Sequence, residues 1–285
     1  MTAKSSLAEQ IEEQKQSNVS AQAHSSWFLP HRQRVTDLIC ARATQDRMGR
    51  LCLLGAGNCN DLDLPRLTEA FAEVHLADID RAALERARAG ETEAVRQRLS
   101  LHELDLSGLH PELEAWRDLR VTPETMMASP AAASKRIASS LPGPFDVVAS
   151  VCLLSQLQLA LRGVLTERHQ LFEAARQIQN LVHLRSLVRL LAPGARALLV
   201  SDLTSDLTYP FHELPADADP GALMRELLRM GNVIYSVNPE LLAWAAREDP
   251  YLARHAELTP WQDAWFWRNG PVRTFLVYAL ELKRR

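Results

Sequence analysis

Two glycines and two carboxylates lie where a nucleoside could be bound. Gly55 and Gly57 follow one apolar run, and a second apolar run ends on Asp78. Glycine has no Cβ, so a ligand can approach the backbone closely at such a turn. A carboxylate at the end of the next strand can accept hydrogen bonds from both hydroxyls of a ribose. Because a third apolar run also ends on an acid, Asp105, this order predicts a nucleoside-binding crevice.

The elements around these residues alternate between strand and helix. The apolar patterns predict strands at 51–54, 74–77, 99–104, 145–151 and 197–201, helices at 61–71, 81–89, 157–191, 221–230 and from 239, and a hairpin of 264–267 and 273–282. Helical crossovers join parallel strands, whereas a hairpin built on Asn269 and Gly270 adds an antiparallel one. We therefore predict an α/β fold: a Rossmann-like, doubly wound, seven-stranded sheet, mostly parallel, with one antiparallel strand in the C-terminal hairpin.

The domain organisation follows from the same pattern. Residues 1–47 are predicted to form an N-terminal helical segment, and residues 48–285 a nucleoside-binding domain. Two stretches, 107–144 and 204–232, interrupt the alternation and are predicted as insertions that shape a substrate pocket. The first is rich in Ala, Ser and Pro, which suggests an inserted or partly mobile segment with a helix near 112–119. We expect the 157–191 helix to break near Gly163.

Composition limits the class of partner. The chain has 285 residues, 47% of them hydrophobic and 24% charged, with a formal net charge of −3. This balance is ordinary for a globular protein and favours neither nucleic acid nor a membrane as a partner. No run has transmembrane length, the first residues lack the apolar core of a signal peptide, and the four cysteines show no C-x-x-C spacing. We therefore expect a cytoplasmic protein without a metal site.

Five sequence motifs, in this order, together resemble those of the class I S-adenosylmethionine-dependent methyltransferases. They are the glycine loop at 51–60, the acid Asp78, the pair Asp105-Leu106, the strand at 145–151, and the turn at 190–199 that resembles the family's L-x-P-G-G motif. The resemblance covers roughly Arg50 to Leu282. It implies S-adenosyl-L-methionine as the cofactor, with Asp78 on the ribose and Asp105 at the adenine amino group. The residues expected to bind the cofactor are Gly55, Ala56, Gly57, Asn60, Asp78, Ile79, Asp105, Leu106, Ser150 and Val151.

The glycine loop departs from the family pattern at two positions. Leu53 stands where the family often has an acid, and Cys59 replaces the third glycine. We expect Asn58, Asn60 or Asp61 to supply the polar contacts to the methionine end instead.

The acids also have purely structural interpretations. Asp78 or Asp80 could cap the helix that begins at Arg81, and Asp105 could cap a turn. Gly55 and Gly57 could serve only a tight strand–helix turn.

The acceptor side is harder to interpret from sequence. The strand at 145–151 is not followed by the Asn/Asp-Pro-Pro-aromatic motif common in methyltransferases of bases and glutamine, so a small-molecule acceptor is predicted. Methyl transfer from a sulfonium depends mainly on positioning, with or without a general base. Catalytic candidates are His31, Tyr209 and His212, with Trp27 as a lid, although for each of them a structural or solvated role is favoured over a catalytic one. Cys152 is expected to pack rather than react.

Two other functions remain open at this stage. A protein that only binds S-adenosylmethionine or S-adenosylhomocysteine is compatible with the altered glycine loop. A nicotinamide-dependent oxidoreductase is less favoured, because Asn60 occupies the third glycine position of G-x-G-x-x-G and no Tyr-x-x-x-Lys pair occurs. The sequence leaves the acceptor atom and the oligomeric state undetermined.

Overall fold

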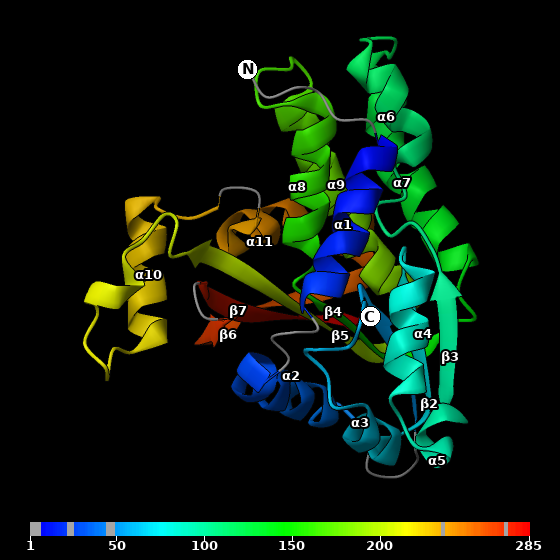
Figure 1. Ribbon diagram of the computed structural model, residues 1–285. Helices are drawn as coiled ribbons and strands as arrows, with labels where there is room; N and C mark the ends of the chain where they lie inside the picture. Colours follow the sequence, from blue (N-terminus) through cyan, green and yellow to red (C-terminus); the bar gives the residue numbers. More distant parts are fainter. Residues whose placement is uncertain (1–6, 22–25, 44–48, 235–236, 271–272) are drawn as a thin grey trace.

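The computed structural model describes residues 7–21, 26–43, 49–234, 237–270 and 273–285, and it contains a seven-stranded sheet in the order β3-β2-β1-β4-β5-β7-β6 (Figure 1). The strands are β1 Gly49–Leu54, β2 Phe71–Asp78, β3 Leu99–Glu103, β4 Phe145–Val151, β5 Leu191–Ser205, β6 Ala256–Arg268 and β7 Thr274–Arg284. Only β7 runs antiparallel to its neighbours, and it lies between β5 and β6. The predicted Rossmann-like, doubly wound sheet with one antiparallel strand is therefore confirmed.

Helices cover both faces of this sheet. They are α1 Leu7–Ala21, α2 Leu29–Cys40, α3 Leu64–Ala70, α4 Arg81–Ala89, α5 Glu93–Arg96, α6 His110–Arg117, α7 Pro123–Ser139, α8 Leu153–Leu165, α9 Phe172–Leu190, α10 Pro220–Met230, α11 Pro239–Glu248 and α12 Pro250–His255. In Figure 1, α2 and α3 lie below the sheet, whereas α8, α9 and α11 lie above it.

Each strand contributes alternate side chains to two hydrophobic cores. Leu51 and Leu53 of β1 pack with the α2 and α3 side chains, whereas Cys52 and Leu54 pack with those of α8 and α9. This period of two is the geometry of a strand buried on both faces, which explains why the sequence shows continuous apolar runs there.

Several elements differ from the predicted ones. The helix expected over 157–191 is two helices, and the break follows Leu165 rather than lying near Gly163. Gly163 lies inside α8, where its missing side chain leaves room for Gln10 of α1; a Cβ there would lie 2.4 Å from the Gln10 side chain. The chain turns instead at Thr166, whose φ is +59°.

The stretch at 107–144 is mostly helical. It holds α6, which was predicted, and α7, which was not, and α7 packs against α9. Ile137 of α7 and Trp116 of α6 are both buried. The second stretch, 204–232, begins with the end of β5 and continues through a short 3-10 turn, Phe211–Glu213, into α10.

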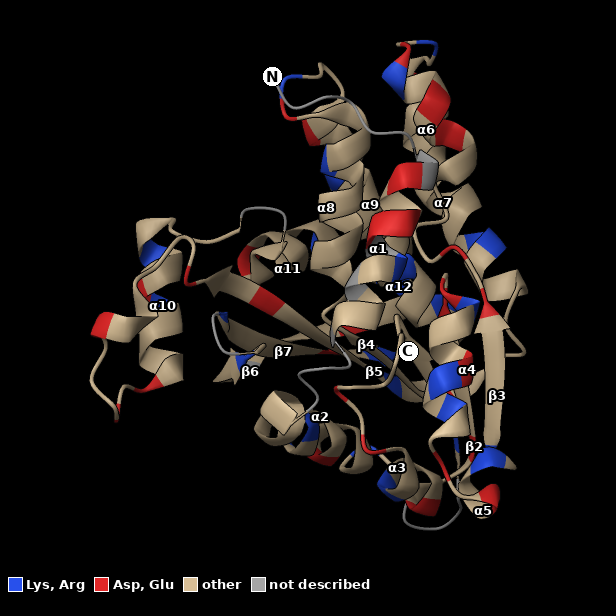
Figure 2. Ribbon diagram, viewed as in Figure 1, with Lys and Arg blue, Asp and Glu red and all other residues tan. Residues whose placement is uncertain are grey.

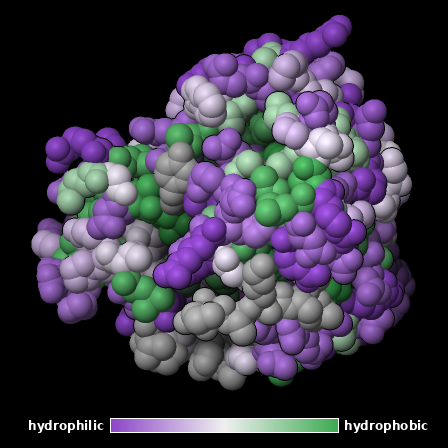
Figure 3. Space-filling model, turned by 90° about the horizontal axis from the view of Figure 1, so that it is seen from above, coloured by the Kyte–Doolittle hydropathy of each residue, from purple (hydrophilic) through white to green (hydrophobic). Residues whose placement is uncertain are grey.

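Neither the charged residues nor the apolar residues gather in one large patch in these views of the described chain. Basic and acidic residues alternate over the helices of the described chain rather than forming one patch (Figure 2). On the face seen in Figure 3, hydrophobic areas lie among hydrophilic ones. Within the described ranges, no helix combines the length and apolar character needed to cross a membrane.

Candidate cofactor and acceptor site

The chain reverses its direction of strand addition between β1 and β4, so a crevice is expected at the carboxyl ends of these two strands. The glycine loop lies there. The N–H groups of Gly55 and Ala56 both donate to the carbonyl of Ala77, at 2.9 and 3.2 Å. This pair of bonds fixes the loop to the end of β2.

The two loop glycines serve different neighbours. Gly55 has φ +75°, and a Cβ there would lie 2.9 Å from Leu153 at the start of α8, so this glycine permits close packing. Gly57 has φ +46°, and the atom nearest its missing Cβ is Oδ1 of Asn18 in α1, at 3.4 Å. The backbone at Gly57 is therefore covered by the N-terminal helix.

Cys59 keeps a glycine-like backbone although it replaces the family's third glycine. Its φ is +54°, a left-handed conformation that costs a non-glycine residue about 1–2 kcal/mol. Its side chain is buried, and burial together with the nearby Asp61 and Asp78 carboxylates raises the pKa of its thiol. The loop thus keeps its shape without the glycine.

Asp78 and Asp80 divide the two roles that the sequence left open. Asp78 Oδ2 accepts the Gly57 N–H and its Oδ1 accepts the Asp80 N–H, both at 2.9 Å. Asp80 caps α4 by accepting the Ala83 N–H at 3.0 Å. Asp78 is 8% exposed, and burial raises its pKa. The Ile79 N–H also bonds this carboxylate, so about one acceptor position remains for a ligand hydroxyl.

Helix α1 closes over this end of the crevice. The Asn18 side-chain amide donates to Asp80 Oδ2 at 3.0 Å, and the Asn58 amide donates to the Asn18 carbonyl at 2.5 Å. Arg86 of α4 donates to Asn58 Oδ1 at 3.2 Å. Every acid and amide at this end therefore has a partner.

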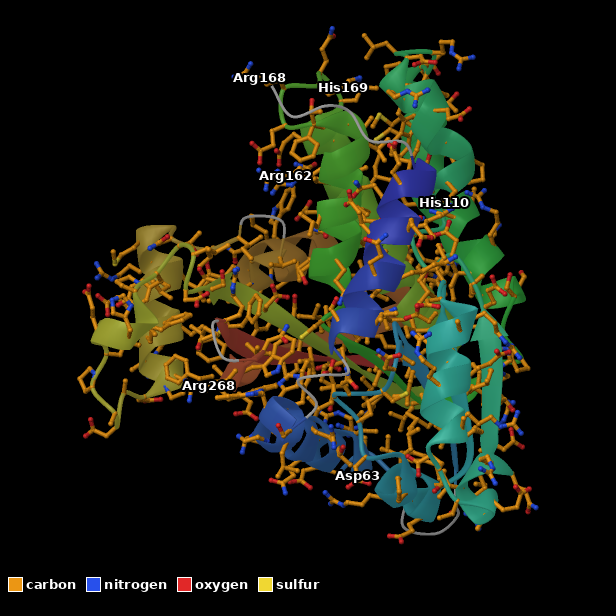
Figure 4. The ribbon with its side chains drawn as sticks, viewed as in Figure 1. Asp63, His110, Arg162, Arg168, His169 and Arg268 are labelled. Carbon is orange, nitrogen blue, oxygen red and sulfur yellow. The ribbon has the colours of Figure 1, made fainter. Side chains whose placement is uncertain are left out.

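Asp105 caps the turn that precedes α6. Its Oδ1 accepts from the N–H and the hydroxyl of Ser107, at 2.8 and 2.7 Å. Its Oδ2 lies 3.4 Å from Nδ1 of His110, which Figure 4 labels on α6. The adenine contact stays a prediction for Asp105, as it does for the neighbouring Leu106 and Ile79.

Ser150 is engaged on the α9 side of the sheet. Its hydroxyl lies 2.9 Å from Nε2 of His183, and both residues are buried. Burial lowers the pKa of His183 to about 4, so the ring is neutral at pH 7. The sequence did not predict this pair, because a single histidine in a long helix gives no indication of its partner on a distant strand. The cofactor contact of Ser150 and of its neighbour Val151 stays a prediction.

At the other end of the crevice, Asp61 has a buried oxygen without a partner. The atom is Oδ1, and burial raises the pKa of the carboxyl to about 7, although the positive charge of Arg32 opposes the shift. Arg32 of α2 also donates to the carbonyl of Asn60 at 2.7 Å. The Arg32 bond holds the end of the glycine loop against α2.

Asp202 is a second carboxylate of this kind, and the sequence analysis missed it. It lies on β5 just beyond the level of Cys152, whose N–H donates to the Val200 carbonyl at 2.9 Å. Asp202 is 7% exposed, its Oδ1 has no partner, and burial raises its pKa. Because the carboxylates of both Asp61 and Asp202 raise the pKa of the Cys152 thiol, both lie near it.

The available signal for Asp202 was its position after an apolar strand, the same pattern that identified Asp78 and Asp105. The predicted strand ended at Ser201, so Asp202 lay outside it and was assigned to no element. In the structure β5 continues to Ser205.

His31 faces the same core from α2. Trp265 donates its indole N–H to Nδ1 of His31 at 3.0 Å, and the ring stacks on Trp267 with centroids 4.4 Å apart. Burial lowers the pKa of His31 to about 3. The neutral ring therefore carries its hydrogen on Nε2, and this buried donor has no partner. His31 is arranged to donate a hydrogen bond rather than to accept a proton.

The other catalytic candidates lie in different surroundings. Tyr209 packs its ring on Phe211 at 5.4 Å, and the His212 side chain is 80% exposed beside Glu213. The ring of Trp27 is covered by the guanidinium of Arg268, labelled in Figure 4, at 5.1 Å. Among the described residues, no group of three or more His, Cys, Asp or Glu could hold a metal ion.

Comparison with known proteins gives alignments to solved structures only. No protein-family model matches the chain, and no curated protein matches it in sequence. The YcgJ protein of Bacillus subtilis is 12% identical, with a TM-score of 0.46, over 89% of this chain and 99% of that one. Magnesium protoporphyrin IX methyltransferase of Synechocystis PCC 6803, solved with bound SAH, is 14% identical, with a TM-score of 0.46, over 89% and 83%. N-methyltransferase NodS of Bradyrhizobium japonicum is 10% identical, with a TM-score of 0.39, over 90% and 97%. The strand order and directions described above define the fold of this chain.

Proposed function

We propose that the protein is an S-adenosylmethionine-dependent methyltransferase that acts on a small-molecule acceptor. The observation that carries the proposal is the bond between Asp78 Oδ2 and the Gly57 N–H at the carboxyl edge of the sheet. It joins the glycine loop to the acid that follows β2, beside the point where strand order reverses. Ligands of open α/β sheets collect at this point.

The residues present fit the nucleoside end of the cofactor. Asp78 has an acceptor position left for a ribose hydroxyl, and Asp105 Oδ2 faces His110 rather than a backbone donor. Leu106 is buried beside them and offers an apolar contact.

The methionine end fits Asp61. The family's usual acid is absent at Leu53, and a buried carboxylate oxygen without a partner lies at the end of the same loop. A carboxylate in this position can accept a charge-assisted hydrogen bond from an ammonium group. When bound, the cofactor supplies an electrophilic methyl group on a sulfonium.

The chain's own residues contribute positioning and exclusion of water. Helix α1 covers the loop through Asn18, and the buried side chains of the α2 core close the other side. A reaction of neutral and cationic groups gains from such a site of low dielectric constant.

A non-catalytic cofactor-binding protein is the second candidate. It is favoured by Leu53 and Cys59 in the loop and by the cover that Asn18 forms over Gly57.

Calorimetric titration with S-adenosylmethionine, S-adenosylhomocysteine and NAD tests the proposal. We expect micromolar binding of the first two and none of NAD. Failure of both sulfur ligands to bind would contradict the proposed cofactor. Turnover separates an enzyme from a binder: formation of S-adenosylhomocysteine with amine, alcohol or thiol acceptors indicates an enzyme.

A further inference from the structure

Asp202 occupies a defined place on the α2 side of the sheet. It is paired in register with Val277 of β7, and Val277 is paired in turn with Trp265 of β6. Side chains of one such row point to the same face, and adjacent strands are about 4.8 Å apart. Trp265 contacts His31 of α2, so this row faces α2. Asp202 therefore lies about two strand spacings from Trp265, about 10 Å.

The walls around Asp202 are largely apolar. Val200 and Val277 belong to the α2-side core. The hydroxyl of Ser155 at the start of α8 donates to the Cys152 carbonyl at 3.3 Å and is near enough to lower the pKa of the Asp202 carboxyl, and Oδ1 of Asp202 has no partner. Burying a carboxylate oxygen without a partner destabilises a protein, so a native exception needs an explanation.

Asp249 shows how the same chain satisfies a buried aspartate. Asp249 is 5% exposed and accepts three hydrogen bonds from Arg185, at 3.1, 3.0 and 2.5 Å. It also accepts the N–H groups of Tyr251 and Leu252 at the start of α12. Two similarly buried aspartates thus differ in their partners: both oxygens of Asp249 accept hydrogen bonds from the protein, whereas Oδ1 of Asp202 has none. A bound ligand would supply the missing partner of Asp202.

We propose that Asp202 binds the methyl acceptor and that the acceptor is an amine, which enters as an ammonium ion. This inference rests on the proposed function and names the substrate class of that site. An ammonium group both donates hydrogen bonds and neutralises the buried charge, whereas an alcohol leaves the charge uncompensated. Asp61 lies on the glycine-loop side of Cys152 and is assigned to the methionine ammonium, so the two carboxylates bind different cations.

The ammonium transfers a proton to the Asp202 carboxylate, which frees the nitrogen lone pair. The amine nitrogen then forms a C–N bond to the sulfonium methyl as the C–S bond breaks, and that electron pair stays on sulfur as a neutral thioether. The product is a methylammonium ion, and the proton on Asp202 passes to solvent. Asp202 is a catalytic residue in this scheme.

The first test needs no acceptor and compares two variants by thermal unfolding of the full chain. Asp202→Asn removes an uncompensated buried charge, so we expect its unfolding midpoint to equal or exceed that of the wild type. Asp249→Asn removes one partner of a satisfied buried pair, so its midpoint should fall by about 5–10 °C. A fall in Asp202→Asn as large as that in Asp249→Asn would mean that Asp202 is structural, and the proposal would be wrong.

The second test uses calorimetry at saturating S-adenosylhomocysteine. The probes are benzylamine, phenethylamine and cyclohexylamine, each paired with its alcohol. We expect at least one amine to bind at least tenfold more tightly than its alcohol, and Asp202→Asn to remove that preference while S-adenosylhomocysteine affinity stays unchanged. Absence of binding by every amine, or an equal affinity for alcohols, overturns the amine assignment. If the wild type fails to bind S-adenosylhomocysteine at all, the proposed function itself fails first.

Discussion

The two ends of the crevice differ in how their polar groups are satisfied. At the end that we propose for the nucleoside, Asp78 and Asp80 are bonded to backbone N–H groups, and Asn18 and Asn58 are bonded to their neighbours. At the end that we propose for the methyl group, Asp61 and Asp202 each bury an oxygen that has no partner.

This difference separates two kinds of binding group. Acids that already accept hydrogen bonds from the protein hold the loop in shape before any ligand binds. They offer a ligand only the lone pairs that these bonds leave free. Unsatisfied acids lower stability until a cation binds, which is why we propose that charged groups of a ligand bind beside them. A residue of the first kind that also contacts the ligand, such as Asp78, should lose both affinity and stability when it is replaced. A residue of the second kind should lose affinity alone.

The largest effect is expected for Asp78→Ala. Loss of one charge-assisted hydrogen bond to the ribose, about 1.5–3 kcal/mol, together with the bond that holds Gly57 in the loop, should weaken S-adenosylhomocysteine binding about 100-fold. The Gly57 and Asp80 N–H groups also lose their acceptor, which should lower the free energy of unfolding by about 1–3 kcal/mol. Calorimetry and urea denaturation measure the two quantities. Asp80→Ala is the matched control: it removes the α4 cap, about 1 kcal/mol, and should affect affinity far less. Unchanged affinity in Asp78→Ala would falsify the ribose assignment.

Asp61→Asn should weaken S-adenosylhomocysteine binding about tenfold, because one charge-assisted bond to the methionine ammonium is lost. Adenosine lacks the methionine part, so its binding should not change. Calorimetry with both ligands measures this contrast. An equal loss for adenosine would place Asp61 at the nucleoside end instead.

The same variant should alter the pH dependence of stability. The folded-state pKa of Asp61 is raised to about 7, above its unfolded value, so the native state holds a proton that the unfolded state has released. Wild-type stability should therefore fall as pH rises from about 4 to about 7, by at most about 4 kcal/mol, and Asp61→Asn should remove this fall. Urea denaturation at several pH values checks it. Parallel curves for the two proteins would show that Asp61 titrates normally.

The smallest effect is expected for Asn18→Ala. Two hydrogen bonds link α1 to the loop and to Asp80, and each contributes about 0.5–1.5 kcal/mol. The alanine variant removes only the side-chain bond to Asp80, so S-adenosylhomocysteine should dissociate about threefold faster in stopped-flow measurements. Gln16→Ala, an exposed position on the same helix, is the control. Equal rates for both variants would mean that α1 does not cover the bound ligand.

Most of the fold could be predicted from the sequence because its signals are local. Continuous apolar runs identify strands buried on both faces, Asn238 with Pro239 begins α11, and Asn269-Gly270 links β6 to β7. Helix α7 was missed because Pro130 and its Ala- and Ser-rich sequence obscure the apolar period.

The residues of the candidate site also fall into those that a local sequence pattern predicts and those that depend on distant contacts. Asp78 follows directly from its place after β2, which is a local pattern. The contact between His31 and Trp265 joins residues 234 positions apart, and Ser150 meets His183 across an inter-element boundary. Such pairs depend on how α2 and α9 pack against the sheet, which no short window of sequence contains.

The position of β7 has a consequence for synthesis of the chain. β7 is the last strand in sequence, yet it lies between β5 and β6 and pairs with both. Until residues 274–284 leave the ribosome, β5 and β6 each present an unpaired edge to other chains. A ribosome that stalls before this strand is made should leave a nascent chain that chaperones must shield from aggregation.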